Sequence, residues 1–251
     1  MWYYTLQYAH TCEYCVAIFL FICVICATFT IDDSQQSSHI GFKNYYGNQQ
    51  VYEQMNYIGD MRNGKYISYY ENGDIRSIGF YVDNKLNGEY IENYTNNKTK
   101  IKSWYINGKL TDKYSEYYPN GQLKIHMTYN DSLPHGTYTM YYINANIIKQ
   151  CYYQNGKLYG EYKEYYFYNI PKIIAYYYDN LRYGEYLEYY SNEQNKIIAQ
   201  YYADKLHGEY FEYSDTGQLK IHTSYYYGKQ IGDFWQCNEN LNNILYCYNK
   251  K

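Results

Sequence analysis

Residues that could do acid–base chemistry recur in this chain at a fixed interval. Glutamates stand three positions apart, and each such pair returns 24 residues later: Glu161 with Glu164, Glu185 with Glu188, and Glu209 with Glu212. Catalysis by two carboxylates needs two unlike environments. A pair that returns at a fixed period has the same surroundings each time. We therefore interpret these glutamates, and the lysines that recur with them, as hydrated charges that keep the protein soluble.

Histidine and cysteine show no arrangement typical of a metal or catalytic site. His126 and His222 occupy equivalent places four repeat lengths apart, too far to share a metal ion. Two C-x-x-C pairs are separated by only seven apolar residues, which is too short a loop for a zinc ribbon: Cys12, Cys15, Cys23 and Cys26. No nucleophile motif and no phosphate-binding loop is present. The sequence predicts no catalytic residue, no metal site and no cofactor.

The period that orders these residues is 24, counted from Gly64 without insertion or deletion. Glycine begins nearly every unit: Gly64, Gly88, Gly136, Gly160, Gly184, Gly208 and Gly232, with Asp112 at the remaining start. A fixed period of this length indicates stacked supersecondary units. Such arrays mainly offer surfaces that hold a ligand.

Tyrosine occupies two places in every complete unit. The third residue is Tyr66, Tyr90, Tyr114, Tyr138, Tyr162, Tyr186 and Tyr210, and the eighteenth is Tyr81, Tyr105, Tyr129, Tyr153, Tyr177, Tyr201 and Tyr225. The chain has 45 tyrosines in 251 residues, and a random scatter would not place fourteen of them so regularly. We therefore expect these fourteen tyrosines to have the same structural role in every unit.

Each unit has the pattern of a β-hairpin, in which two aromatic and β-branched runs are separated by turn residues. Asn72-Gly73 and Asn120-Gly121 predict a type I′ turn at the ninth and tenth positions, and a second turn of about four residues closes the unit. Across the first turn, the third position should face the small sixteenth, where Cys151 reads as a packed small side chain. The eighteenth should face the third of the next unit, which would line one face with tyrosines. The expected fold is all-β, an elongated antiparallel meander of stacked hairpins.

The array is expected to have atypical ends, because a terminal repeat has an edge in water. Residues 41–63 resemble a degenerate opening repeat one residue short, with Tyr45, Tyr46 and Tyr57 as its remnants. Seven repeats span 64–231. Residues 232–251 would be a closing cap, with Phe234 in the place of the third tyrosine.

The first 31 residues differ from the rest. Tyr14 to Ile31 carries no charge over eighteen residues, and residues 32–40 read as a linker. This length is near the lower limit for a membrane-spanning helix and slightly above that of a signal-peptide core. Three interpretations remain open: an uncleaved membrane anchor, a cleaved signal, and a buried apolar element. The first two predict a membrane-anchored or secreted protein. Its orientation is undetermined, because no nearby positive charge sets it.

Charge argues against nucleic acid as a partner. The formal net charge is −3, and lysines and arginines are spread along the array. Binding to phosphates would require a basic stripe.

One motif resembles a known family. Tyr153 to Gly160 reads aromatic, x, x, Gly, Lys, x, x, Gly, and Tyr105 to Asp112 follows the same pattern more loosely. These residues resemble the MORN repeat in its variant form, of the kind found in bacteria and giant viruses. The chain departs from the standard motif in using Tyr where Trp is common, and Tyr162 replaces a glycine. The resemblance covers residues 64–231 well and 41–63 poorly.

The resemblance implies a row of β-hairpins that acts as a scaffold for proteins or, in some members, for membrane lipid. It implies no catalytic residues. The leading interpretation is therefore a non-enzymatic scaffold with an unidentified protein partner, which tyrosine-rich surfaces suit. The alternatives are an array bound at a lipid interface, and an antitoxin-like immunity protein, since some variant-repeat proteins carry that label. An enzyme carrying such repeats as an accessory would need a further domain.

Overall fold

The computed structural model describes residues 40–239 and 245–249. Its strands are β1 (Ile40–Tyr45), β2 (Val51–Ile58), β3 (Met61–Tyr69), β4 (Ile75–Val82), β5 (Lys85–Leu86), β6 (Gly88–Asn93), β7 (Thr99–Ile106), β8 (Lys109–Tyr117), β9 (Leu123–Asn130) and β10 (Leu133–Tyr141). They continue as β11 (Ile147–Gln154), β12 (Lys157–Tyr165), β13 (Pro171–Tyr178), β14 (Leu181–Tyr189), β15 (Asn195–Tyr202), β16 (Lys205–Tyr213), β17 (Leu219–Tyr226), β18 (Lys229–Glu239) and β19 (Leu245–Asn249). Within these ranges the one helical element is the 3-10 turn η1 (Phe167–Asn169).

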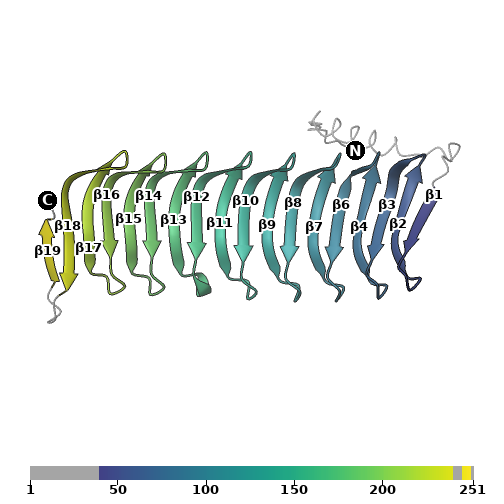
Figure 1. Cartoon of the computed structure of the whole chain (residues 1–251), viewed down its shortest axis with the longest axis horizontal. Coiled ribbons are helices and arrows are strands. Elements are labelled where there is room, and N and C mark those ends of the chain that lie inside the picture. The colour runs from purple at the N-terminus through teal and green to yellow at the C-terminus, as the bar shows by residue number, and fades with distance from the viewer. Residues whose placement is uncertain (1–39, 240–244, 250–251) are drawn as a thin grey trace, which may run out of the picture. The chain divides into compact units, whose positions relative to one another are not determined.

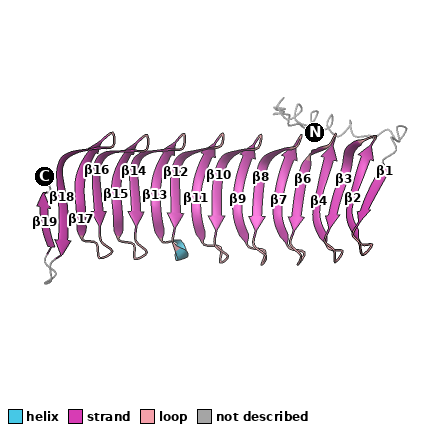
Figure 2. Cartoon of the chain, viewed as in Figure 1, coloured by secondary structure: helices cyan, strands magenta, loops and turns pink. Residues whose placement is uncertain are grey.

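All 19 strands belong to one sheet. Consecutive strands pair antiparallel, except that β5 and β6 both pair with β4 and together take the place of one strand. Figure 1 shows the strands side by side in sequence order, and Figure 2 shows that no helical layer covers the described part of the sheet. The expected all-β antiparallel meander of hairpins is confirmed.

Positions within a unit are numbered from 1 at Gly64 and at every twenty-fourth residue on either side of it. The second turn of each unit, at positions 20 and 21, is a two-residue turn with positive φ at both residues, between 48° and 82° from Asp83 onwards. The strand pairing extends up to this turn; for example, Tyr178 pairs with Leu181, and only the two turn residues lie between them. This is the type I′ geometry, whose twist matches that of the flanking strands.

The first turn differs from the expected type I′ turn. Positive φ occurs at position 10 alone, as at Gly73 and Gly121, except where Tyr168 and Asn169 are both positive. The asparagine at position 9 has another role, because its side chain accepts a hydrogen bond from the backbone N–H of position 11. An example is Asn72 Oδ1 with Asp74 N, at 3.0 Å. Asn-Gly here is thus an Asx turn followed by one left-handed residue, and not two left-handed residues.

The repeat glycines lie in β-bulges. At the start of each unit, extra residues are inserted into the strand. Tyr201 pairs with Leu206 and Ala199 pairs with Tyr210, so the three residues 207–209 lie opposite the single residue Gln200. Position 1 has φ between 54° and 116° in all eight units that start from Gly64 to Gly232. Glycine adopts this conformation without steric cost, which explains its recurrence. Asp112, at φ 54°, is tolerated because aspartate is among the residues that enter this region most readily.

The register confirms one expected pairing and corrects another. Position 3 faces position 16 of its own unit, as Tyr186 faces Ala199. Position 18 does not face position 3 of the next unit; it faces position 23, as Tyr201 faces Leu206. The expectation was wrong because the second turn has two residues where about four were assumed, and the bulge then shifts the following strand.

Position 16 forms the line of buried residues along the sheet. Its members are buried in every unit: Met55, Gly79, Ser103, Met127, Cys151, Ala175, Ala199 and Thr223. Tyrosines at position 3 lie on both sides of it, and a Cβ on Gly79 would lie 3.1 Å from the ring of Tyr90. Six of these eight residues are small, which lets the rings pack against them without gaps, and the other two are methionines.

The opening repeat has the full length. Phe42 faces Met55 and Ile40 faces Tyr57, in the register that position 3 and position 1 have elsewhere. The unit therefore begins at Ile40 and has 24 residues, not the 23 expected for residues 41–63. The mismatch arose because Phe42 stands where later units have tyrosine.

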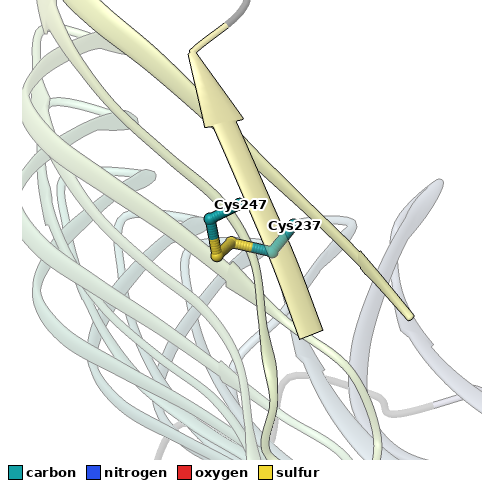
Figure 3. The surroundings of a disulfide bond; sticks show 2 residues. All are labelled: Cys237 and Cys247. Atoms are coloured by element: carbon teal, nitrogen blue, oxygen red, sulfur yellow. A yellow bond between two sulfur atoms is a disulfide. The ribbon is translucent and has the colours of Figure 1, made fainter. Parts of the chain in front are cut away.

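The closing cap includes the hairpin of β18 and β19, joined by a disulfide between Cys237 and Cys247 (Figure 3). The apolar segment 14–31 and its interpretation as a helix lie outside the described residues. Among the described residues no helix is long and apolar enough to cross a membrane.

Candidate binding faces

The repeat tyrosines gather on one face of the sheet, which we call the tyrosine face. In each unit the rings at positions 3 and 18 are diagonal neighbours, with centroids 5.3 to 6.2 Å apart and mostly edge to face. Aromatic pairs favour this geometry. The fourteen rings are thus brought together in pairs within a unit, and each is half-buried.

Burial disfavours the phenolate form of several of these tyrosines. It raises the pKa of Tyr114, Tyr153 and Tyr210 to about 12, with Glu116, Cys151 and Glu212 respectively as the second cause. It also raises the pKa of Tyr162 and Tyr186, helped by Glu164 and Glu188, which accept hydrogen bonds from the two hydroxyls. These five hydroxyls therefore keep their protons to a higher pH than an exposed tyrosine does.

A third tyrosine series, at position 7, was missed by sequence reasoning. Its hydroxyls donate to the backbone carbonyl of position 6 in the next unit, at 2.6 to 3.0 Å. These tyrosines are Tyr46, Tyr70, Tyr94, Tyr118, Tyr166 and Tyr190. Each bond links adjacent hairpins beside their first turns. The signal was present in the sequence, since position 7 is tyrosine in every unit from Tyr46 to Tyr190.

The structure separates the glutamate pairs. Positions 2 and 5 are three residues apart on one strand, so their side chains leave opposite faces. Glu188 lies on the tyrosine face with a side chain 17% exposed, and Lys196 contacts it at 2.6 Å. Glu209, at position 2, is 54% exposed. The expectation of equivalent, hydrated charges thus fits position 2 and fails at position 5, where each glutamate is half-buried. Glu164 and Glu188 are ion-paired, and Glu212 accepts a hydrogen bond from the hydroxyl of Tyr210.

One cluster contains the residue types of a catalytic triad without its geometry. Glu209 accepts hydrogen bonds from Ser224 Oγ at 2.7 Å and contacts His222 Nε2 at 2.5 Å. These hydrogen bonds lower the pKa of the Glu209 carboxyl, with Ser224 the larger cause. In a triad the serine bonds to the imidazole, which takes its proton. Here both groups bind the same exposed carboxylate, so the serine has no base.

The opposite face, which we call the second face, carries a continuous series of rings, four of them exposed and two half-buried, that sequence reasoning also missed. One ring stands on each strand from β12 to β17: Tyr159, Tyr178, Tyr183, Tyr202, His207 and Tyr226. Successive centroids are 5.2, 5.9, 5.2, 5.8 and 5.1 Å apart. We call these six residues the ring ladder. Tyr178, Tyr202 and Tyr226 are 55%, 47% and 56% exposed.

The ladder tyrosines differ from the structural ones in their hydroxyls. Within the described part of the chain no acceptor lies within hydrogen-bonding distance of the hydroxyls of Tyr178, Tyr202 or Tyr226, whereas the position 7 hydroxyls are bonded to backbone. Positions 19 and 24 form the ladder only in the later repeats. In the earlier repeats, position 19 holds Val82, Ile106 and Asn130, and position 24 holds Asn87 and Thr111. A search for residues invariant in all units therefore overlooks it.

The cysteines of the array have two different environments. Cys151 is 3% exposed, and burial raises the pKa of its thiol, so it is an unreactive packed side chain. Cys237 and Cys247 form the disulfide shown in Figure 3. Sequence reasoning treated this pair as scattered, because only the β18–β19 pairing brings Cys237 opposite Cys247.

The fold and its two faces define a class of protein: a repeat protein made of β-hairpins in a single sheet. A family model described as the MORN repeat variant matches residues 62–83, 113–131 and 206–225, each a strand pair around one first turn. The chain therefore carries variant MORN repeats, which confirms the resemblance seen in the sequence.

No curated protein matches the chain. Among solved structures, the crystal structure of TcdB2-TccC3-Cdc42 is similar over 82% of this chain at 8% identity, with a TM-score of 0.21. The chain spans 15% of the length of that solved chain. A similarity this low supports no conclusion about fold or function.

Proposed function

We propose that this protein is a non-enzymatic scaffold that binds a partner protein through the ring ladder. The observation that supports this is the six-ring series with exposed edges and hydroxyls that have no acceptor among the described residues. Tyrosine provides large contact area at small entropy cost, and its hydroxyl can bond to a partner. The chain's other tyrosine series use their rings, and many of their hydroxyls, within the sheet.

The rest of the described array suits a scaffold better than an enzyme. The Ser224–Glu209–His222 cluster lacks a base for the serine, and the glutamates expected in pairs lie on opposite faces. Variant MORN repeats are commonly interaction repeats, and this is consistent with a binding role. An antitoxin-like immunity protein would be one form of such a scaffold.

Binding to an anionic membrane is the less favoured alternative. Position 2 of the same strands lies on the second face beside the ladder, and it holds Glu161, Glu185 and Glu209. These carboxylates would face the negative surface potential of anionic lipids. Flotation of the array with anionic and neutral vesicles tests this alternative directly. Co-flotation with both would favour a lipid interface over a protein partner.

Capture by the immobilised full chain from extract of the source cells tests the scaffold. We expect the triple substitution Tyr178→Ala, Tyr202→Ala and Tyr226→Ala to remove a specific captured protein. The control is Phe80→Ala with Trp104→Ala, which removes two rings of similar exposure, 46% and 44%, outside the ladder. Capture that survives the triple substitution would rule out the ladder as the binding surface.

We also propose that the array resides in an oxidising compartment that it reaches through residues 1–31, as an anchored or a secreted protein. Disulfides persist in such compartments, and Cys237–Cys247 is one. In source cells, thiol alkylation without reductant should leave both cysteines unmodified, and the chain should fractionate with membranes or be secreted. Phe21→Lys, in the middle of the apolar run, should return it to the soluble intracellular fraction. Alkylation of both cysteines in untreated cells would contradict this placement.

A further inference from the structure

The ring ladder has a measurable period across the sheet. Tyr178, Tyr202 and Tyr226 stand on every second strand, and Tyr183 and His207 stand on the strands between them. Neighbouring strands are about 4.8 Å apart, so equivalent rings recur about every 9.6 Å. The ladder runs across the strands, and a ligand that follows it must lie at right angles to them.

A polyproline II helix has nearly the same period. It has three residues per turn and rises about 3.1 Å per residue, so one side of it recurs about every 9.3 Å. Its backbone makes no internal hydrogen bonds, which leaves carbonyl oxygens free. Domains that bind such helices use aromatic-lined grooves, in which little conformational entropy is lost.

We infer that the partner held by the ladder contains a proline-rich segment in the polyproline II conformation, lying across strands β12 to β17 with one turn of its helix for each repeat. The inference rests on the proposed scaffold function and names the chemistry of the partner. Prolines at intervals of three residues recur with every second ring, that is, once per repeat. The hydroxyls of Tyr178, Tyr202 and Tyr226 donate to carbonyls of the segment.

The inclination of the ladder rings to one another supports this occupant. Tyr178 with Tyr183 and Tyr183 with Tyr202 are edge to face, at interplanar angles of 82° and 71°. The other three pairs are tilted, at 39° to 49°. Successive rings are therefore inclined, with recesses between them, and do not form one flat platform. A puckered proline ring fits such recesses, whereas a flat sugar or base favours a parallel ring face.

The length of the ladder sets the length of the segment. Six rings on six adjacent strands span five strand spacings, about 24 Å. A polyproline II helix of about eight residues covers this distance. Affinity should rise with peptide length up to about eight or nine residues and then level off.

The test uses fluorescent oligoproline peptides of three, six, nine and twelve residues and the full chain, with anisotropy as the measurement. A nine-residue Gly-Ser peptide and a chitin hexasaccharide serve as comparison ligands. We expect saturable binding of the nonamer, weaker binding of the hexamer, and no gain for the dodecamer. Tyr202→Ala should weaken nonamer binding roughly tenfold, the effect of losing about one ring contact. Tyr202→Phe should weaken it less, and Trp104→Ala should leave it unchanged.

The outcomes separate this inference from the proposed function. Absence of saturable nonamer binding, equal binding by Tyr202→Ala, or preference for the hexasaccharide would overturn the inference. If the triple ladder substitution still abolishes capture of a protein, the scaffold function stands and only the polyproline II partner falls. Circular dichroism of each variant establishes that the sheet is retained, so that a loss of binding is not a loss of folding.

Discussion

Single side chains in this sheet are constrained by what stands on the adjacent strands. Position 16 illustrates this, since its side chain is buried between rings in every unit, and six of its eight residues are small while two are methionines. Serine and threonine fit there by size, although their hydroxyls are then buried. Ser103 Oγ and Thr223 Oγ1 have no hydrogen-bond partner among the described residues. Position 16 therefore requires burial and tolerates an unsatisfied hydroxyl.

Thr223→Val should stabilise the protein by about 1 kcal/mol, because it replaces a buried, unpaired hydroxyl with a methyl of similar size. Urea unfolding of the two proteins measures the difference. The reciprocal control is Ala199→Thr, which adds a hydroxyl at the equivalent place and should destabilise. Destabilisation by Thr223→Val would contradict the cost assigned to the unpaired hydroxyl.

The position 7 hydroxyls give a second test at this scale. Tyr118→Phe removes the 2.8 Å hydrogen bond to the carbonyl of Tyr141, and it should cost about 1 kcal/mol in unfolding free energy. Tyr178→Phe is the matched control, since no acceptor among the described residues bonds to its hydroxyl, and it should be nearly neutral. Equal losses from the two changes would contradict the structural role of position 7.

At the scale of the element, one hairpin with its two unlike turns is the unit of folding. The backbone N–H of position 21 donates to the carbonyl of position 23 in the preceding unit, as Asp204 N does to Arg182 O at 3.1 Å. The position 7 hydroxyl makes a similar link near the first turn. Each hairpin is therefore coupled mainly to its neighbours, and stability should depend on copy number.

Deletion of one whole unit, Gly160 to Tyr183, should leave a folded and slightly less stable sheet, because the residues brought together have equivalent positions. Deletion of twelve residues, Gly160 to Pro171, should not. This deletion removes one strand, so every later strand reverses its direction. The type I′ turns and the Asx turns then lie at the opposite edges of the sheet, and position 16 no longer pairs with position 3 at the junction. Far-ultraviolet circular dichroism and thermal melting measure both. Equal tolerance would argue against the 24-residue unit.

The terminal hairpin depends on the disulfide more than the inner hairpins depend on any bond. β19 has one pairing partner, β18, among the described strands. Cys247→Ser should increase hydrogen exchange in residues 245–249 and leave exchange in β6 to β16 unchanged. Increased exchange throughout the sheet would show that the disulfide stabilises the whole array.

Many tyrosines of the whole molecule are half-buried, and this predicts that the folded protein loses stability at high pH. In the folded protein the pKa values of Tyr114, Tyr153 and Tyr210 are near 12, whereas an unfolded tyrosine titrates near 10. Between these values the unfolded chain loses protons that the folded chain keeps. Stability contributed by these tyrosines is therefore complete below pH 10 and is lost as the pH rises towards 12.

Urea unfolding at a series of pH values, together with phenolate absorbance, measures this effect. We expect the unfolding free energy to fall above pH 10, and part of the phenolate absorbance to appear only near pH 12. Tyr114→Phe with Tyr210→Phe should reduce this late phase. Absence of a late phase would contradict the burial of these tyrosines.

The sequence by itself determined the period, the all-β hairpin architecture and the pairing of position 3 with position 16. These features depend on local turn chemistry and on ring size, which are written in every unit. It also contained the position 7 series, which was overlooked because its tyrosines adjoin a turn.

Only the tertiary structure decided the rest. The face that a side chain takes after a bulge depends on how many residues the bulge inserts, and Asn-Gly alone does not distinguish an Asx turn from a type I′ turn. For this reason the structure was needed to move Tyr201 from opposite Tyr210 to opposite Leu206. The opposite faces of positions 2 and 5, in contrast, follow from strand alternation alone. The ring ladder and the Cys237–Cys247 disulfide arise from cross-strand neighbours, and these are set by strand register across the sheet.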